Sequence, residues 1–198
     1  MYRSSFTELP DIVKNLLIIN ILLFIAQQSF PNYLEYHLGL HSFNSNHFNV
    51  YQVITYGFLH GDISHLIFNM FPLFMFGRVL ENTWGSKRFL NFYLLTVIGA
   101  GVVQLITSDF GLTIGASGAV FGLLAGFGML FPNTQLFLLF PPIPIKAKYF
   151  VIGYAILELI AGVRAVEGDN IAHFAHLGGA IVGYIIIKYW QKNNNSFY

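Results

Sequence analysis

The sequence contains no cysteine among its 198 residues. A disulfide framework, a thiolate metal site and a cysteine nucleophile are therefore excluded. Charge is also scarce, because Asp, Glu, Lys and Arg make up 10% of the chain, against about 25% in soluble domains. Hydrophobic residues make up 55%, and the mean hydropathy is +0.60. The composition predicts one membrane domain, residues 1–198, and a net charge of +1 gives no reason to expect a nucleic-acid partner.

Six apolar segments approach the length of about 20 residues that an α-helix needs to cross the hydrocarbon core. They predict an all-α membrane protein, a bundle of six transmembrane helices at residues 12–30, 63–80, 89–107, 117–131, 147–163 and 172–190. The connection at residues 31–62 contains no Lys or Arg, and it is long and too polar to span. We expect this long loop between the first two helices to lie partly in the membrane interface.

Lys and Arg are distributed unevenly among the predicted connections. One side of the bundle holds nine of the ten, and the other side holds only Arg164. Basic loops stay in the cytoplasm, so we expect both termini there and the long loop outside. No organelle-targeting peptide is evident, and no seventh span follows the sixth, which favours a bacterial-type plasma membrane.

The fourth span, within TIGASGAVFGLLAGFGMLF, is short and begins with Ser117. Its 15 residues, 117–131, extend about 22 Å as a helix, whereas the hydrocarbon core is about 30 Å thick. The outer end of this helix should therefore begin below the outer surface. Because non-helical backbone at that depth needs protein or water around it, we expect Ser117 at the bottom of a wet pocket that opens to the outer face.

Polar side chains gather at the outer ends of three predicted spans. His65 and Asn69 are four residues apart on the second span and share one helix face. His173 and His176 lie at the start of the sixth span, and Ser117 starts the fourth. Polar groups inside spans are costly, and are therefore candidates for function by default.

Two rows of glycines predict which helices meet. Gly118, Gly122 and Gly126 repeat every four residues along the fourth span, and Gly179 and Gly183 do so in the sixth. Such rows let membrane helices approach closely, although they are common in plain packing interfaces. If the two rows face each other, the serine of one span comes within hydrogen-bond reach of a histidine of the other.

This arrangement indicates acyl-transfer chemistry. A serine hydroxyl needs a base to remove its proton, and His176 is the candidate base for Ser117. The developing oxyanion needs hydrogen-bond donors, which the Ser117 backbone N–H, the His65 ring and the Asn69 amide could provide. We find no carboxylate in the right place to complete a triad. We therefore predict a dyad, with His176 oriented by packing, for example against Phe121.

These residues lie in motifs that resemble the rhomboid intramembrane serine proteases, over residues 51–184 and in the family's order. The matching stretches are HGDISHLIFNMFPLFMFG, LENTWGSKRFLNFYL, GASGAVFGLL and AHFAHLGGAIVG. The resemblance implies a six-helix core, a serine endopeptidase with a Ser–His dyad, transmembrane protein substrates cleaved in or near the bilayer, and no cofactor or metal.

Carried over by position, the resemblance makes Ser117 the nucleophile and His176 the general base, with His65 and Asn69 at the oxyanion site. His173 is not itself the base. Phe121 stands where the family often has tyrosine. Structural roles near the site are expected for His60, Phe121, Gly115, Gly118, Gly179 and Gly183.

Two acidic residues remain outside this scheme. Glu158 lies in the middle of the fifth span, and the resemblance gives it no role, so we interpret it as a neutral carboxyl paired within the bundle. Glu81 belongs to a predicted cytoplasmic turn whose role we expect to be structural.

Two other functions are compatible with parts of this sequence. The first is a metal-binding or transport protein, in which His60, His65, His173 and His176 ligate zinc. Against it, the HxxxxH spacing differs from the HExxH of helical metalloproteases, no carboxylate is expected near these histidines, and no internal repeat is evident. The second is a non-catalytic rhomboid-like protein that binds membrane clients, which the presence of both dyad residues disfavours.

Overall fold

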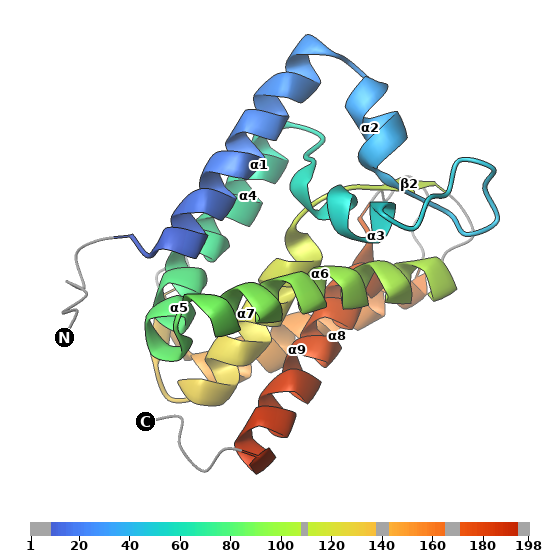
Figure 1. Ribbon diagram of the computed structural model, residues 1–198. Helices are drawn as coiled ribbons and strands as arrows, with labels where there is room; N and C mark the ends of the chain where they lie inside the picture. The colour runs from blue at the N-terminus through green and yellow to red at the C-terminus, as the bar shows by residue number, and fades with distance from the viewer. Residues whose placement is uncertain (1–8, 108–110, 138–142, 165–170, 194–198) are drawn as a thin grey trace.

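The computed structural model describes residues 9–107, 111–137, 143–164 and 171–193, and is mainly helical (Figure 1). Its long helical elements are α1 (Asp11–Ser29), α4 (Ile63–Pro72), α5 (Arg78–Trp84), α6 (Ser86–Thr107), α7 (Ser117–Leu130), α8 (Ala147–Arg164) and α9 (His173–Asn193). Its short helical elements are α2 (Tyr33–Leu38), α3 (Gln52–Thr55), η1 (Tyr56–Phe58) and η2 (Leu73–Gly77). The strands β1 (Leu40–His41), β2 (Leu112–Thr113), β3 (Gln135–Phe137) and β4 (Pro144–Lys146) form two small antiparallel pairs.

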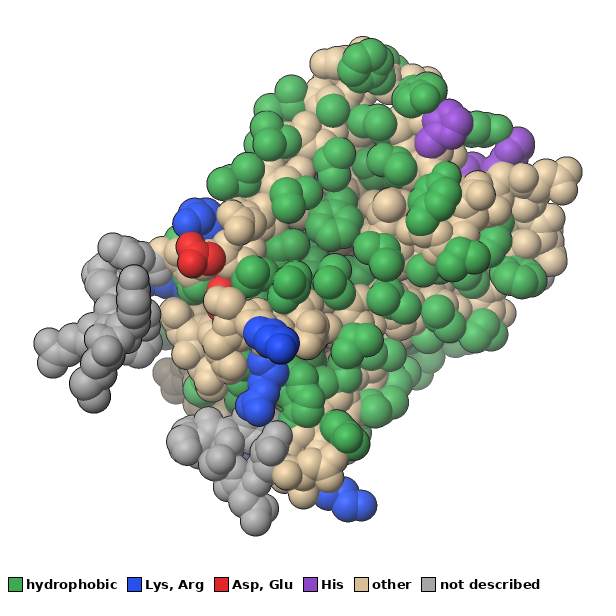
Figure 2. All heavy atoms as spheres, viewed as in Figure 1, with side chains coloured by type: hydrophobic (Ala, Val, Ile, Leu, Met, Phe, Trp, Pro, Cys, Tyr) green, Lys and Arg blue, Asp and Glu red, His purple; other side chains and the backbone are tan. Residues whose placement is uncertain are grey.

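Three helices in the described part of the chain are long and apolar enough to cross a membrane: Asp11–Ser29, Ile63–Trp84 and Ser86–Thr107. The shorter helix α7 is also apolar. Many large hydrophobic side chains are exposed, and apolar side chains cover most of the face drawn in Figure 2. The structure therefore fits a membrane protein, and each of the six predicted spans corresponds to a helical segment.

The second of these segments, Ile63–Trp84, changes its winding in the middle. It begins as α4, continues through the π-helical turn η2 and ends as α5. Pro72 is the last residue of α4 and has no N–H to donate to the preceding turn. A π-helical turn accommodates such a local break without ending the helix. The helix thus continues past the proline and lines one side of the cavity described below.

The connection at residues 31–62 is not a plain loop, because it contains α2, β1, α3 and η1. Strand β1 pairs with β2, with Leu40 opposite Thr113, and so holds the stretch that leads to α7. The backbone N–H of Gly115 also donates to the carbonyl of Tyr56 at 2.9 Å. A segment distant in sequence therefore sets where α7 begins.

Helix α7 is buried along most of its length and packs against α6 and α9. A Cβ on Gly179 would come within 1.8 Å of the Gly118 carbonyl oxygen, and a Cβ on Gly183 within 3.0 Å of Gly122. Gly179 and Gly183 thus pack directly on the α7 backbone at Gly118 and Gly122, an approach that residues with larger side chains would prevent. The third glycine of the α7 row, Gly126, lies instead against Trp84, Phe92 and Leu80. The contact of Gly179 and Gly183 with α7 fixes the depth of α9 relative to α7 and brings their first turns together.

Candidate active site

Ser117 is the first residue of α7, at the point where the chain turns into the helix. The turn requires Gly115, whose φ of +126° disfavours residues with a Cβ. The N-cap residue, Ala116, has no side chain that could accept from the first helical N–H groups. These N–H groups lack partners within the helix, so the positive end of α7 lies beside the serine hydroxyl.

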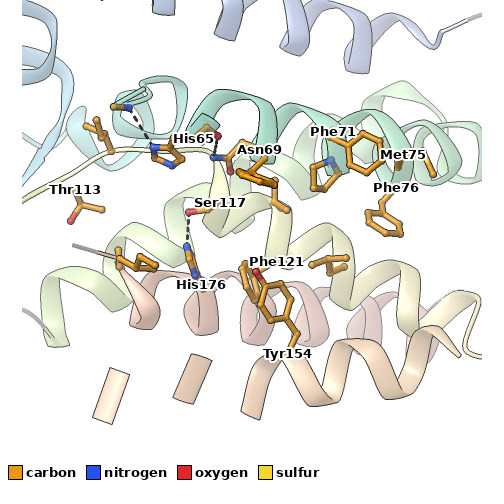
Figure 3. A pocket seen from close by; sticks show the side chains of 18 of the residues that line it. His65, Asn69, Phe71, Met75, Phe76, Thr113, Ser117, Phe121, Tyr154 and His176 are labelled. Carbon is orange, nitrogen blue, oxygen red and sulfur yellow. Dashed lines mark hydrogen bonds between the residues drawn. The ribbon is translucent and has the colours of Figure 1, made fainter. Parts of the chain in front are cut away.

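His176 lies in the first turn of α9, and its Nε2 is 2.8 Å from Ser117 Oγ (Figure 3). The imidazole is 9% exposed. The contact follows from the glycine packing, because Gly179 is three residues after the histidine and Gly118 directly follows the serine. The sequence pattern predicted this pair, and the two atoms are at hydrogen-bond distance.

An aromatic stack supports one face of the His176 imidazole. The rings of Phe121 and His176 are parallel within 9°, with centroids 4.5 Å apart. Tyr154 of α8 packs on Phe121, with centroids 4.8 Å apart. The orientation of the histidine by packing against Phe121 is thus present in the geometry, and a third helix contributes to it.

The expectation that no carboxylate lies near the histidines is wrong. Glu158 Oε2 is 2.9 Å from His176 Nδ1 and 2.6 Å from His173 Nδ1. Glu158 is buried, with 7% of the residue exposed. The serine, the histidine and the glutamate therefore form a continuous chain of hydrogen bonds, which sequence reasoning missed because it could not fix the rotation of α8 about its axis.

The four histidines of the alternative zinc-site hypothesis do not come together as one metal site. Among the described residues, the group that could hold one ion consists of Glu158, His173 and His176. His60 and His65 instead pack edge to face on each other, with centroids 5.1 Å apart. The histidines divide into two pairs because His60 and His65 belong to the α4 end of the site, whereas His173 and His176 face α8.

His65 and Asn69 lie on α4 and face the cavity beside the serine (Figure 3). A Cβ on Gly115 would be 2.7 Å from His65 Nε2 and 3.7 Å from Ser117 Oγ, so this glycine separates the ring from the hydroxyl. Asn69 Nδ2 donates to the His65 carbonyl at 2.8 Å, and its amide has a second hydrogen. Both side chains are positioned as possible donors at one edge of the site.

His60 lies below this edge and is fully buried. Its backbone is fixed by Gln27 of α1, which donates to the His60 carbonyl at 3.1 Å and accepts from the His60 N–H at 3.0 Å. The residue thus ties the start of α4 to α1 and supports His65 from behind.

Ser117, His176, His65 and Asn69 line a cavity of about 1420 Å³. Phe71, Met75 and Phe76 line it from the second helical segment, and Phe150 and Tyr154 line it from α8 (Figure 3). A polar end with the serine and the histidine thus continues into an apolar channel. The channel is large enough to take a stretch of polypeptide.

Comparison with known proteins agrees with these features. The Rhomboid domain family matches residues 47–192, which include the serine, the histidines and the glutamate of the site. The chain belongs to the rhomboid family.

Similar rhomboid proteins come from plants, fungi and bacteria. The chain is 31% identical to RHOMBOID-like protein 12, mitochondrial, of Arabidopsis thaliana, over 88% of this chain and 57% of the relative. It is 31% identical to Rhomboid protein 1, mitochondrial, of Saccharomyces cerevisiae, over 71% and 42%, and 26% identical to Rhomboid protease GlpG of Yersinia pestis, over 77% and 52%. The chain thus spans about half the length of these relatives.

One sequence signal could have located the carboxylate in this rhomboid domain. Glu158 is the sole acidic residue within the six predicted spans, and His173 and His176 are three apart at the start of the sixth. Residues three apart on a helix share a face. Two imidazoles on one face need an acceptor, and a lone carboxyl in an adjacent span is the nearest source of one.

Proposed function

We propose that this chain is an intramembrane serine endopeptidase in which Ser117 is the nucleophile and His176 the general base. The observation that carries the proposal is the distance of 2.8 Å between Ser117 Oγ and His176 Nε2. The pair lies in the wall of a cavity large enough for a peptide. A hydroxyl within hydrogen-bond reach of an imidazole is the arrangement that activates a serine.

The reaction would proceed in two stages. Ser117 Oγ attacks the carbonyl carbon of the scissile peptide bond as its proton moves to His176 Nε2. The imidazolium then gives this proton to the amide nitrogen, the C–N bond breaks, and the amine product leaves an acyl-serine. In the second stage His176 takes a proton from water, the hydroxide attacks the ester carbon, and Ser117 regains its proton as the acid product leaves.

The oxyanion of each stage would be stabilised from the α7 end of the site. The first N–H groups of α7 point from its N-terminus, where the helix dipole favours negative charge. His65 and Asn69 line the same region from α4. Removal of one such donor, as in Asn69→Ala, is expected to lower the rate on the order of 10²-fold.

We propose that all six long helical segments span the membrane, with both termini in the cytoplasm and the site open to the outer face. Two observations support this orientation. Nine of the ten Lys and Arg residues lie on the predicted cytoplasmic side, and on the face drawn in Figure 2 the charged side chains gather toward the end of the molecule where α1 begins and α9 ends. A bacterial-type plasma membrane is the location we propose.

The proposed substrates are transmembrane proteins. The apolar channel between the second helical segment and α8 offers a path for a substrate helix from the lipid to the serine. A helix in lipid hides its carbonyls in its own hydrogen bonds, so the substrate must unwind locally before Ser117 can attack. We therefore expect cleavage near residues with weak helix propensity.

Labelling with a fluorophosphonate probe tests the proposal, since this reagent reacts covalently with an activated serine. We expect wild-type protein in detergent micelles to be labelled, and Ser117→Ala and His176→Ala to remain unlabelled. Ser29→Ala is the matched control, because Ser29 Oγ only donates to a carbonyl of its own helix.

A wild-type protein that folds but neither reacts with the probe nor cleaves a panel of transmembrane reporters contradicts the proposal and favours the non-catalytic, client-binding alternative. Activity that a chelator abolishes and added zinc restores also contradicts it, in favour of a metal-dependent function.

A further inference from the structure

Glu158 is placed to act on the histidine of the proposed dyad. It lies on α8, with one carboxyl oxygen within hydrogen-bond distance of Nδ1 of both His176 and His173. The opposite ring nitrogen of His176 faces the serine. The proposed catalytic step uses Nε2 of His176 and leaves Nδ1 unused. A glutamate that only filled space in the bundle would have no reason to contact this second nitrogen.

Helix packing gives this contact a structural basis. Gly162 is one turn after Glu158 on α8, and a Cβ there would lie 3.1 Å from His173 Cβ. The glycine therefore lets the first turn of α9 approach α8 closely. His173 and His176, three residues apart, then present both imidazoles to the same carboxyl group.

An ionised carboxylate can only accept hydrogen bonds, so it requires a proton on His176 Nδ1. The neutral imidazole then has no proton on Nε2, which is free to accept from Ser117 Oγ–H. The alternative tautomer would turn an N–H toward the serine and could not take its proton. The carboxylate would also stabilise the imidazolium that forms when the proton moves from the serine.

We propose that Glu158 is a positioning residue for His176, and that the site works as a Ser117–His176–Glu158 triad in which His173 donates a second hydrogen bond to the carboxylate. The inference rests on the proposed function and adds to it a residue that holds the base in its working tautomer. No proton reaches Glu158 in the cycle, because the proton travels only between Ser117, His176 and the reacting groups.

The same three groups could be considered as a metal site, but their spacing favours hydrogen bonds. Ligand atoms about 2.0 Å from a tetrahedral zinc ion lie about 3.3 Å from one another. Here the oxygen of Glu158 is 2.9 and 2.6 Å from the two nitrogens. These are distances for N–H donors to a charged acceptor.

The test compares wild-type protein with Glu158→Gln in proteoliposomes that contain a transmembrane reporter. The glutamine side chain has nearly the same shape, but its NH₂ group can donate to His176 Nδ1 and favour the wrong tautomer. We expect kcat to fall on the order of 10³- to 10⁴-fold, with KM changed less than about twofold. Glu158→Asp keeps a carboxylate on a shorter side chain, and we expect its kcat to be at least about tenfold higher than that of Glu158→Gln.

Ile156→Ala, an exposed position on the same helix, is the matched control and should leave kcat unchanged. If Glu158→Gln has the kcat of wild type, or if its loss of activity is explained entirely by a smaller folded fraction, the triad is wrong but the proposed function stands. Inactive wild-type protein that also fails to react with a fluorophosphonate overturns the proposed function, and the triad with it. Activity that depends on zinc overturns the triad in favour of a metal site.

Discussion

Two glutamates are buried in the part of the chain that the structure describes, and they have different partners. Glu81, at the α5 end, is 2% exposed, and Glu158, beside the candidate site, is 7% exposed. Glu81 accepts from the backbone N–H groups of Ile12 and Val13 at 3.0 and 2.8 Å, and from Ser86 Oγ at 2.6 Å. Glu158 meets two imidazoles. Backbone amides do not gain or lose protons, whereas imidazoles do, so burial alone does not distinguish a structural carboxylate from a functional one.

Helices α1 and α7 also differ in which groups lie at their N-termini. Helix α1 follows Pro10, which supplies no side-chain cap, and Glu81 caps its first N–H groups from 69 residues away. Helix α7 follows Ala116, which supplies no side-chain cap either. At α1 the positive end of the helix is neutralised by a fixed anion. At α7 it remains beside Ser117, available to a transient oxyanion.

The largest effect on stability is expected from Glu81→Ala. This change leaves buried N–H groups of α1 without an acceptor and removes hydrogen bonds to a charged group, at a cost of about 3 kcal/mol in the free energy of unfolding. Thermal denaturation in detergent measures it. Activity per folded molecule should be unchanged, unlike that of Glu158→Gln. An unchanged melting temperature would show that Glu81 does not anchor α1.

The next effect is expected from Gly179→Ala, at the α7–α9 contact. Its Cβ would lie 1.8 Å from the Gly118 carbonyl oxygen, so the helices must separate. We expect a loss of about 2 kcal/mol in stability from overpacking, together with a lower kcat per folded molecule as the Ser117–His176 distance grows. Gly153→Ala, where a Cβ meets nothing within 4 Å, is the control. If the two variants have the same stability and the same kcat, the Gly179 contact with α7 does not determine the positions of Ser117 and His176.

A smaller effect is expected from Phe121→Leu, which removes the ring stacked on His176. An aromatic pair contributes about 0.5–1.5 kcal/mol, so kcat should fall about 2- to 13-fold through poorer orientation of the imidazole. Phe131→Leu removes a comparable aromatic pair, with Phe127, near the other end of α7. It should leave kcat per folded molecule unchanged, and similar losses in the two variants would contradict a specific role for the stack.

The smallest effect is expected at Asp62, the exposed N-cap residue of α4. Hydrogen bonds from the Ser64 hydroxyl and the His65 backbone N–H hold its pKa below the ordinary 3.8. A lowered pKa in the folded state adds stability above the ordinary value, and this stability is lost as the pH falls through the lowered one. The melting temperature of wild type should therefore exceed that of Asp62→Ala at neutral pH, and the gap should close below pH 3.8. If the difference in melting temperature is independent of pH, the charge of the Asp62 carboxylate does not cause it.

The sequence predicted much of the proposed dyad because its signals are local. The spacing of His65 and Asn69, and the position of Ser117 at the head of a short helix, follow from helical geometry. The glycine rows also predicted that the fourth and sixth spans meet, since two flat helix faces can pack together in few ways. The structure has these residues around one cavity.

The carboxylates were interpreted less well. The sequence predicts that Glu158 is a neutral carboxyl paired within the bundle; it is paired there, but with His173 and His176, which the sequence does not identify as its partners. The sequence predicts that Glu81 belongs to a cytoplasmic turn, whereas it lies in α5 and caps α1. In both cases the partner is on another helix, and the contact depends on how far each helix is rotated and how deep it lies.

By itself, the sequence determined the apolar helical class, the serine at the start of a short helix and the histidine pattern, because composition and helical periodicity act within one segment. Only the tertiary structure decided that Glu158 meets both imidazoles of α9 and that Glu81 caps α1. A polar contact between helices forms within about 3 Å, whereas rotation of a helix by one residue moves a side chain to another face. That rotation is set by packing of the whole bundle.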